Sequence, residues 1–104
     1  MLSFLKKLFG QETLDYSALM NRGAIIIDVR TPLEYSRGHV SESINLPLNE
    51  IRGNITEIKK QNKPIITCCR SGARSGSAAS ILKNAGIEAY NGGSWNQVNR
   101  ALSN

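Results

Sequence analysis

The chain has 104 residues, 40% of them hydrophobic, and a formal net charge of +5. A chain of this size and composition can form one domain with a single core, and it has no apolar run near the roughly 18 residues that a membrane-spanning helix needs. Its one histidine and two cysteines make no zinc-ligand set, and its scattered basic residues favour a small anion or an acidic protein face over nucleic acid as a partner.

The first ten residues, MLSFLKKLFG, differ in character from the rest. Leu2, Leu5 and Phe9 fall on one helical face, which predicts a short amphipathic turn or helix that docks on the domain or frays. No charged region precedes the apolar residues and no small-residue cleavage site follows them, so the segment is not typical of a targeting signal. We expect an amphipathic segment at 1–10 and the folded domain at 11–104.

Local signals in the first third of the chain predict two short helices around a buried strand. Asp15 can cap a helix at 16–21. Residues 24–29, AIIIDV, are a continuous apolar run that ends in a carboxylate, which is typical of a strand buried on both faces of a parallel sheet. Thr31 and Glu34, with a proline directly after the threonine, form a capping-box pattern that predicts the start of a second helix.

The alternation of strand and helix continues to the end of the chain. We expect strands at 43–47, 64–68 and 87–90, helices at 48–60 and 74–85, a turn at Gly92-Gly93 and a last helix capped by Ser94. This order predicts a three-layer α/β/α domain with a mostly parallel central sheet. Ligands of such folds bind beyond the carboxyl ends of the strands, so we expect Asp28 and the cysteine pair to face one crevice.

The stretch CCRSGARS carries the chemistry, and its two cysteines allow two interpretations. From Cys68 to Arg74 it reads C-x5-R, the loop length of cysteine-dependent phosphatases. From Cys69 to Arg74 it reads C-x4-R, which is one residue shorter. Strand residues alternate between faces, and the apolar run before the loop places Cys68 in the strand and makes Cys69 the first residue to leave it. This pattern favours Cys69 as the residue that faces the loop.

Small residues follow the cysteines, namely Ser71, Gly72 and Ala73. They let the backbone wrap with its N–H groups inward, and such a nest at a helix N-terminus binds anions. A thiol at its centre is expected to have a lowered pKa, helped by Arg70 and Arg74. No general base is then needed, and the segment contains none.

Other polar residues are expected to have structural roles. Arg30 and Glu34 are predicted to form an ion pair or to cap a helix. His39 is predicted to be a hydrogen-bonded structural residue, and Ser71 and Ser75 can cap the following helix through their hydroxyls. Arg74 is expected either to bind the anion or to pair with Asp28 and brace the loop.

Three blocks of this sequence, in this order, resemble single-domain rhodanese-like sulfurtransferases, and the likeness covers about residues 13–102. The blocks contain Asp28, Val29, Arg30, Glu34, Tyr35, Gly38 and His39; Cys69, Arg70, Gly72, Arg74 and Ser75; and Gly92, Gly93 and Trp95. In that family the nucleophile opens a six-residue loop, which implies Cys69 here. The family often has an aromatic or aliphatic residue at the preceding position, where this chain has Cys68.

The resemblance implies a thiosulfate sulfurtransferase that carries sulfur as a persulfide on Cys69, with no metal and no organic cofactor. Its partners would be a small anionic donor such as thiosulfate and a thiol or cyanide acceptor, with a sulfur-carrier protein as another acceptor. Residues 70–75 (Arg70, Ser71, Gly72, Ala73, Arg74 and Ser75) would bind the substrate. From its place at the end of a strand, Asp28 is expected either to cap nearby N–H groups or to support the loop. Arg70 is expected to attract the sulfonate group of the donor.

Two other classes of function stay open on the sequence. One is a cysteine-dependent phosphatase or arsenate reductase that uses Cys68 in a C-x5-R loop. The other is a non-catalytic binding module of rhodanese fold.

Two adjacent cysteines do not form a structural bridge, so we expect a reducing, cytoplasmic setting. One compact domain without an apolar stripe beyond its first residues predicts a monomer.

Overall fold

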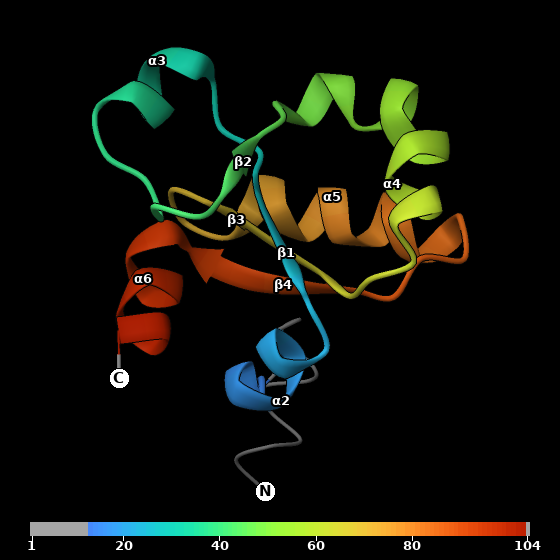
Figure 1. The fold of residues 1–104 in the computed structure, drawn as a ribbon. Helices are drawn as coiled ribbons and strands as arrows, with labels where there is room; N and C mark the ends of the chain where they lie inside the picture. Colours follow the sequence, from blue (N-terminus) through green and yellow to red (C-terminus); the bar gives the residue numbers. More distant parts are fainter. Residues whose placement is uncertain (1–12, 104) are drawn as a thin grey trace, which may run out of the picture.

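The computed structural model describes residues 13–103, and the predicted amphipathic segment at 1–10 lies outside the described residues. In chain order the elements are α2 (Tyr16–Asn21), β1 (Ile25–Asp28), α3 (Pro32–Ser36), β2 (Ile44–Asn45), the 3-10 turns η1 (Leu48–Glu50) and η2 (Arg52–Asn54), α4 (Ile55–Gln61), β3 (Ile65–Cys69), α5 (Ala73–Asn84), β4 (Ala89–Ser94) and α6 (Trp95–Ser103). The strands form a sheet in the order β2-β1-β3-β4 (Figure 1), and every neighbouring pair is parallel.

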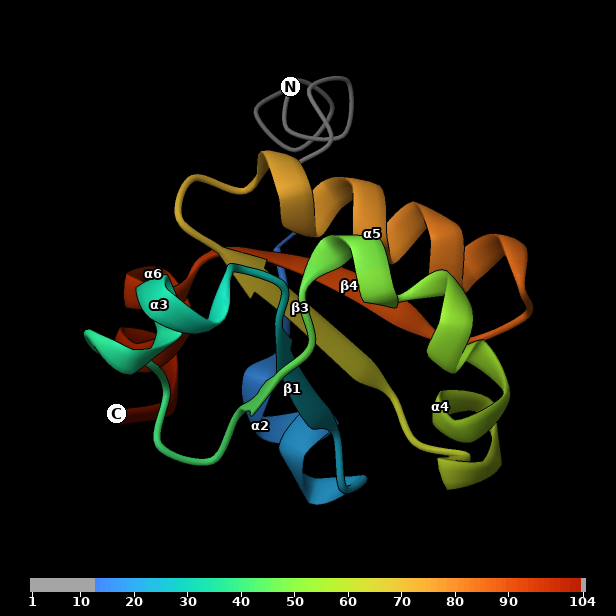
Figure 2. The ribbon, with the colours of Figure 1, turned by 90° about the horizontal axis from the view of Figure 1, so that it is seen from above.

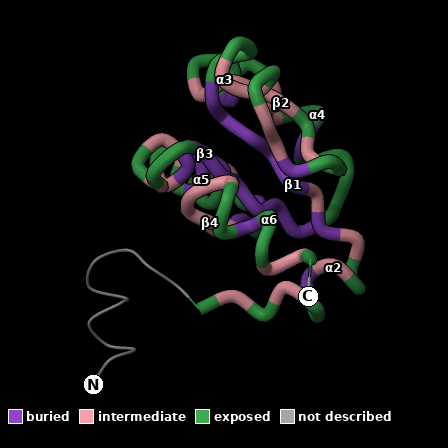
Figure 3. The backbone as a smooth tube through the Cα atoms, turned by 90° about the vertical axis from the view of Figure 1, so that its left-hand side faces the viewer, coloured by how far each residue is buried: buried purple, intermediate pink, exposed green. Residues whose placement is uncertain are grey.

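Helices cover both faces of this sheet (Figure 2), which confirms the predicted three-layer α/β/α domain. On one face Ile58 of α4 and Leu82 of α5 pack in a core with Ile65 of β3. On the other face Leu19 of α2 and Val98 of α6 pack in a second core with the next strand residue, Ile66. Successive residues of β3 therefore belong to different cores, as the alternation of side chains in a strand requires. Strands β1 and β3 form the buried centre of the domain (Figure 3).

Three predicted helix caps are confirmed. Asp15 caps α2 by accepting a hydrogen bond from the backbone N–H of Ala18. Thr31 and Glu34 form both reciprocal bonds of a capping box at the start of α3. At the start of α6, Ser94 accepts from the backbone N–H of Gln97, whose side chain in turn accepts from the backbone N–H of Ser94.

The single helix predicted at 48–60 is wrong in its first half. Two 3-10 turns, η1 and η2, precede α4, which begins only at Ile55. The apolar spacing still places Ile51 and Ile58 in the core. Gly53 and Asn54 are weak helix formers, and this pair interrupts the α-helical geometry while the buried side chains keep their places.

The end of the sheet also differs from the prediction. Strand β4 begins at Ala89 and runs through Gly92 and Gly93 to Ser94, so the expected turn at the glycine pair is wrong. Strand β2 is shorter than expected and ends before Pro47, which has no N–H to donate to a neighbouring strand. Among residues 13–103, no helix is long and apolar enough to cross a membrane.

Candidate active site

Cys68 and Cys69 lie next to each other at the carboxyl end of β3 but on opposite faces of the sheet. Cys68 belongs to the core under α2 and α6, whereas Cys69 belongs to the core under α4 and α5. Their exposed fractions are 0% and 1%. Cys69 is the last residue of β3 and not the first residue after it, but its orientation toward the following loop is as predicted.

The loop from Arg70 to Ser75 surrounds the Cys69 sulfur with hydrogen-bond donors. The backbone N–H of Gly72 donates to Sγ across 3.0 Å, and the backbone N–H of Ser75 donates across 3.4 Å. The Ser75 hydroxyl oxygen lies 3.3 Å from the same sulfur. Gly72 has a φ of +104°, a conformation that favours glycine, and it is the N-cap of α5. The predicted nest at the helix N-terminus is therefore present around Cys69.

These surroundings separate the two thiols by acidity. Burial raises the pKa of Cys69, but hydrogen bonds from the Ser75 hydroxyl and from the backbone N–H groups of Ser75, Gly72 and Ser71 outweigh it, so the pKa is lowered. Burial and the nearby Asp28 carboxylate raise the pKa of Cys68 to about 12. Since a thiolate is the nucleophilic form of cysteine, this difference in pKa favours Cys69 over Cys68 as the reactive thiol.

At pH 7, iodoacetamide is expected to alkylate Cys69 of the folded protein and to leave Cys68 unmodified. The two side chains are buried to nearly the same extent, so the selectivity reports ionisation rather than exposure. Peptide mapping by mass spectrometry after a timed reaction measures it. The rate should level off at a pH below the ordinary pKa of a cysteine. Faster modification of Cys68 would contradict the assignment.

Arg74 faces α3 rather than Asp28. Its guanidinium donates to both carboxylate oxygens of Glu34, across 2.8 and 3.0 Å, so the predicted pairing with Asp28 is wrong. Hydrogen bonds from Arg74 and from Thr31 lower the pKa of Glu34 to about 2. The Glu34 carboxylate therefore completes the capping box of α3 and also binds Arg74 in the first turn of α5, directly after the loop.

Asp28 is fully buried and is paired with Arg30. Its carboxylate accepts from the backbone N–H and the guanidinium of Arg30. Arg30 therefore forms a structural ion pair and Glu34 caps α3, as predicted, but the partner of Arg30 is Asp28 and not Glu34. The Arg30 guanidinium in turn lies over the ring of Trp95, at 5.0 Å from its centroid. In the register of β1 and β3, Asp28 stands beside Cys68, so it shares that face and does not face a common crevice with Cys69.

The remaining predicted residues take several positions. Arg70, Ser71 and Ala73 are exposed at the loop surface. Ser75 is fully buried and does not cap α5, because its hydroxyl points to Cys69 and to Asn91 of β4. His39 is held structurally, as predicted: its Nδ1 lies 2.7 Å from the carbonyl oxygen of Tyr35, and the two rings stack at 3.7 Å.

Sequence reasoning missed two residues that hold the loop. The Thr67 hydroxyl donates to the carbonyl of Ser75 across 2.8 Å, which ties β3 to the first turn of α5. Asn91 binds Ser75, Gly72 and Gly93 through its side-chain amide. Both are ordinary polar residues in strands, and nothing in the local pattern distinguishes them from residues that only face solvent.

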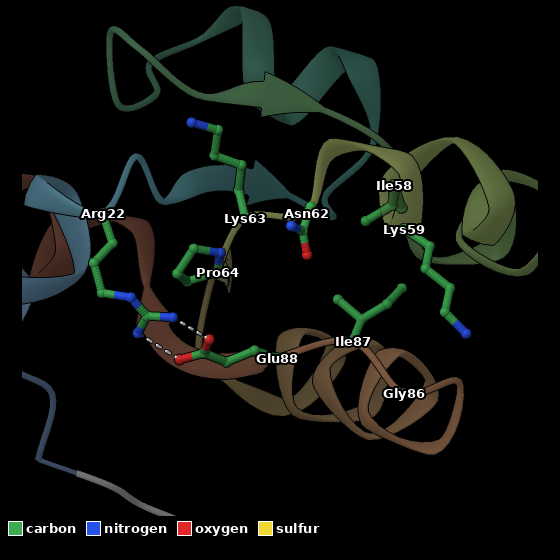
Figure 4. A pocket seen from close by; sticks show the side chains of 9 residues that line it. All are labelled: Arg22, Ile58, Lys59, Asn62, Lys63, Pro64, Gly86, Ile87 and Glu88. Carbon is green, nitrogen blue, oxygen red and sulfur yellow. Dashed lines mark hydrogen bonds and ion pairs between the residues drawn. The ribbon is translucent and has the colours of Figure 1, made fainter.

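A hollow of about 370 Å³ lies at the opposite end of the sheet from the loop (Figure 4). Ile58, Pro64 and Ile87 supply its apolar lining, and Arg22 and Glu88 form an exposed ion pair at its edge. The hollow lies at the amino ends of β3 and β4, whereas ligands of parallel sheets bind beyond the carboxyl ends of the strands. It therefore plays no part in the site around Cys69.

The sequence model of the rhodanese-like domain matches residues 12–100, which is most of the chain and includes the whole loop. The chain belongs to the rhodanese-like domain family. An uncharacterized protein of Bacillus subtilis, YqhL, is 41% identical over 71 residues, which are 67% of this chain and 56% of that protein. The thiosulfate sulfurtransferase PspE of Escherichia coli is 39% identical over 61 residues, or 58% of this chain and 59% of that protein. The rhodanese-like chain thus spans little more than half the length of these two relatives.

Solved structures agree with the rhodanese fold. A structure titled rhodanese with anions from E. coli has a TM-score of 0.65 at 34% identity and covers 71% of this chain and 89% of that one. A rhodanese-related protein of Thermoplasma volcanium has a TM-score of 0.68 at 26% identity, with 85% and 86% of the two chains covered.

Proposed function

We propose that this rhodanese-like protein is a sulfurtransferase that carries sulfane sulfur on Cys69. The observation that carries the proposal is the set of inward donors, with the N–H of Gly72 at 3.0 Å from the Cys69 sulfur in a thiol whose pKa is lowered. Membership of the family and the relatives named thiosulfate sulfurtransferase support the same activity.

The chemistry takes two displacement steps. The Cys69 thiolate attacks the outer sulfur of thiosulfate, the S–S bond of the donor breaks, and sulfite leaves with the bonding electron pair. The persulfide anion that remains on Cys69 is stabilised by the N–H groups that point into the loop. A thiolate or cyanide acceptor then attacks the terminal sulfur, and the Cys69 thiolate is regenerated.

The charged residues around the loop suit an anionic donor. Arg70 is exposed directly after the nucleophile, where it can attract the sulfonate group of thiosulfate without passing through the core. Arg74 is already occupied by Glu34, so we assign it a bracing role and not a primary role in donor binding. Asp28 supports the strand end that carries Cys68, through its pair with Arg30.

The phosphatase alternative would need Cys68 in the loop. Cys68 lies on the other face of the sheet with a pKa raised to about 12, which argues against it. A binding module without catalysis would have no need of a thiol whose pKa is lowered by four donors. The two alternatives remain as outcomes of the test.

Intact-protein mass spectrometry after incubation with thiosulfate tests the proposal on wild type, Cys69→Ser and Cys68→Ala. We expect wild type and Cys68→Ala each to gain the mass of one sulfur atom and Cys69→Ser to gain none. A sulfur on Cys69→Ser would refute the assignment of the nucleophile. No gain in any variant, from thiosulfate or from glutathione persulfide, would refute sulfur transfer. Aryl-phosphate hydrolysis that is lost in Cys68→Ala would establish the phosphatase instead.

A further inference from the structure

Asn91 reaches the surroundings of Cys69 because it lies on the α5 face of β4, two residues after Ala89, which belongs to the core under α4 and α5. A bulge in β4 follows it. Thr67 of β3 pairs with Asn91, but Cys69, two residues later, pairs with Ser94, three residues later on β4. Gly93 in the bulge has a φ of +86°. Across the loop, a Cβ at Gly76 of α5 would lie 3.1 Å from Asn91 Nδ2, so this glycine leaves room for the amide. The strand alternation and the space at Gly76 therefore allow the Asn91 side chain to point toward the start of α5.

The orientation of the Asn91 amide is fixed by two backbone groups. Oδ1 accepts from the N–H of Gly93 across 2.9 Å, and Nδ2 donates to the carbonyl of Gly72 across 3.0 Å. A backbone N–H can only donate and a carbonyl can only accept, so the amide cannot be reversed without the loss of both bonds. Asn91 therefore presents an oxygen, and not an NH₂ group, to Ser75.

This orientation decides where the Ser75 hydroxyl proton lies. The hydroxyl oxygen is 2.7 Å from Asn91 Oδ1, and because Oδ1 can only accept, Ser75 must be the donor. The lone pairs of Ser75 then face Cys69 Sγ at 3.3 Å and can accept from its S–H. When Cys69 ionises, the same hydroxyl can rotate and donate to the sulfur, while Asn91 Oδ1 keeps its bond to the N–H of Gly93.

We propose that Asn91 is a positioning residue that governs the ionisation of Cys69 through the Ser75 hydroxyl. The neutral amide oxygen takes the Ser75 proton while Cys69 is protonated and releases it to the sulfur when the thiolate forms. A carboxylate at the same position would hold that proton more tightly and keep it from the sulfur. The proposal deepens the proposed function, on which it rests, because it concerns the same nucleophile.

The charged and titratable groups around the sulfur are distributed over several elements. Arg74 acts on Cys69 from α5 and is paired with Glu34 of α3, and the adjacent thiol of Cys68 comes from β3 itself. Arg70 lies at the exposed surface of the loop. From β4 the side chain that joins the network is the uncharged Asn91. A negative charge at position 91 would add directly to the field at the sulfur, so the test must separate charge from hydrogen bonding.

A double-mutant cycle makes this separation. The pKa of Cys69 is measured from the pH dependence of iodoacetamide alkylation in wild type, Asn91→Asp, Ser75→Ala and the double variant. In the presence of Ser75, Asn91→Asp should raise the pKa by about one unit, roughly a tenfold fall in the ratio of thiolate to thiol at a given pH. In the Ser75→Ala background the charge and the lost bond from Asn91 to the Gly72 carbonyl still act, but the bond to the Ser75 hydroxyl does not, and the rise should be about half a unit or less.

Equal shifts in the two backgrounds would overturn the proposal, because the effect of Asn91→Asp on the pKa of Cys69 would then not pass through the Ser75 hydroxyl. Asn91→Ala in the same cycle is the second test: its effect on the pKa must also depend on Ser75, and additivity would overturn the proposal. Asn45→Ala is the matched control. The Asn45 amide also binds backbone, donating to the carbonyls of Asp28 and Arg30, but at the far edge of the sheet. This variant should lower the Tm without moving the pKa of Cys69.

Alkylation requires no sulfur donor, so the cycle is independent of the test of the proposed function. If the effects of the Asn91 and Ser75 substitutions on the pKa depend on each other but no persulfide forms, sulfur transfer is refuted and the role of Asn91 is supported. If the two effects on the pKa are additive and the persulfide forms normally, only the role of Asn91 is refuted.

Discussion

Gly72→Ala is expected to lower the rate of persulfide formation about 100-fold, the usual cost of removing one preorganised donor from an anion site. Gly72 has a φ of +104°, which an alanine adopts only under strain. A Cβ at this position would stand 3.5 Å from the Cα of Gly93, an ordinary contact, so the problem is the backbone conformation and not a clash. The strained loop would relax and move the Gly72 N–H away from the Cys69 sulfur.

Stopped-flow measurement of sulfite release, in a single turnover with thiosulfate, gives this rate. Gly53→Ala is the matched control, because Gly53 has no positive φ and a Cβ there would meet nothing within 4 Å. The control variant should transfer sulfur at the wild-type rate. A Gly72→Ala protein that also keeps that rate would show that the Gly72 N–H does not stabilise the reacting sulfur.

Asp28→Asn is expected to reduce the free energy of unfolding by about 3–5 kcal/mol, the usual cost of breaking a buried ion pair from one side. The carboxylate is fully buried and binds both the backbone and the guanidinium of Arg30, and Arg30 is itself 5% exposed. The amide would leave the Arg30 charge buried without a counter-ion. A loss of this size is a large part of the stability of a small domain.

Urea unfolding of wild type and Asp28→Asn measures this difference. Glu88→Gln serves as the comparison, since it removes one charge of the exposed Arg22–Glu88 pair and should change the stability little. Similar effects in the two variants would mean that burial does not distinguish these ion pairs. A stable Asp28→Asn protein would remove the assigned structural role of Asp28.

Local signals were sufficient to predict the architecture and the different placement of the two cysteines. The apolar runs at 24–29 and 64–68 are buried central strands because apolar residues occupy both of their faces, and the capping box at Thr31 marks a helix start whatever surrounds it. The alternation of strand residues was enough to assign Cys69 and Cys68 to different environments. Each of these predictions depends on residues close together in the chain.

Other failures concern contacts between distant segments. Glu34 and Arg74 are 40 positions apart, and Ser75 and Asn91 are 16 apart. Glycines at 92 and 93 resemble a turn in the sequence, but β3 holds them in the sheet, where a Cβ at Gly92 would lie 2.9 Å from the carbonyl oxygen of Thr67. The sequence shows which residues are small or charged, whereas the partner of each is decided by how the sheet brings the chain together.

The division of the two cysteines between the faces of the sheet also determines how the protein responds to oxidants. Many redox-sensitive cysteines are protected by a second thiol that converts a sulfenic acid into a disulfide before further oxidation. Cys68 is the only other cysteine in the chain, and the sheet itself stands between its sulfur and that of Cys69. The two thiols are adjacent in sequence, but the sheet keeps them from forming a disulfide with each other. Repair of an oxidised Cys69 therefore depends on a thiol supplied from solution.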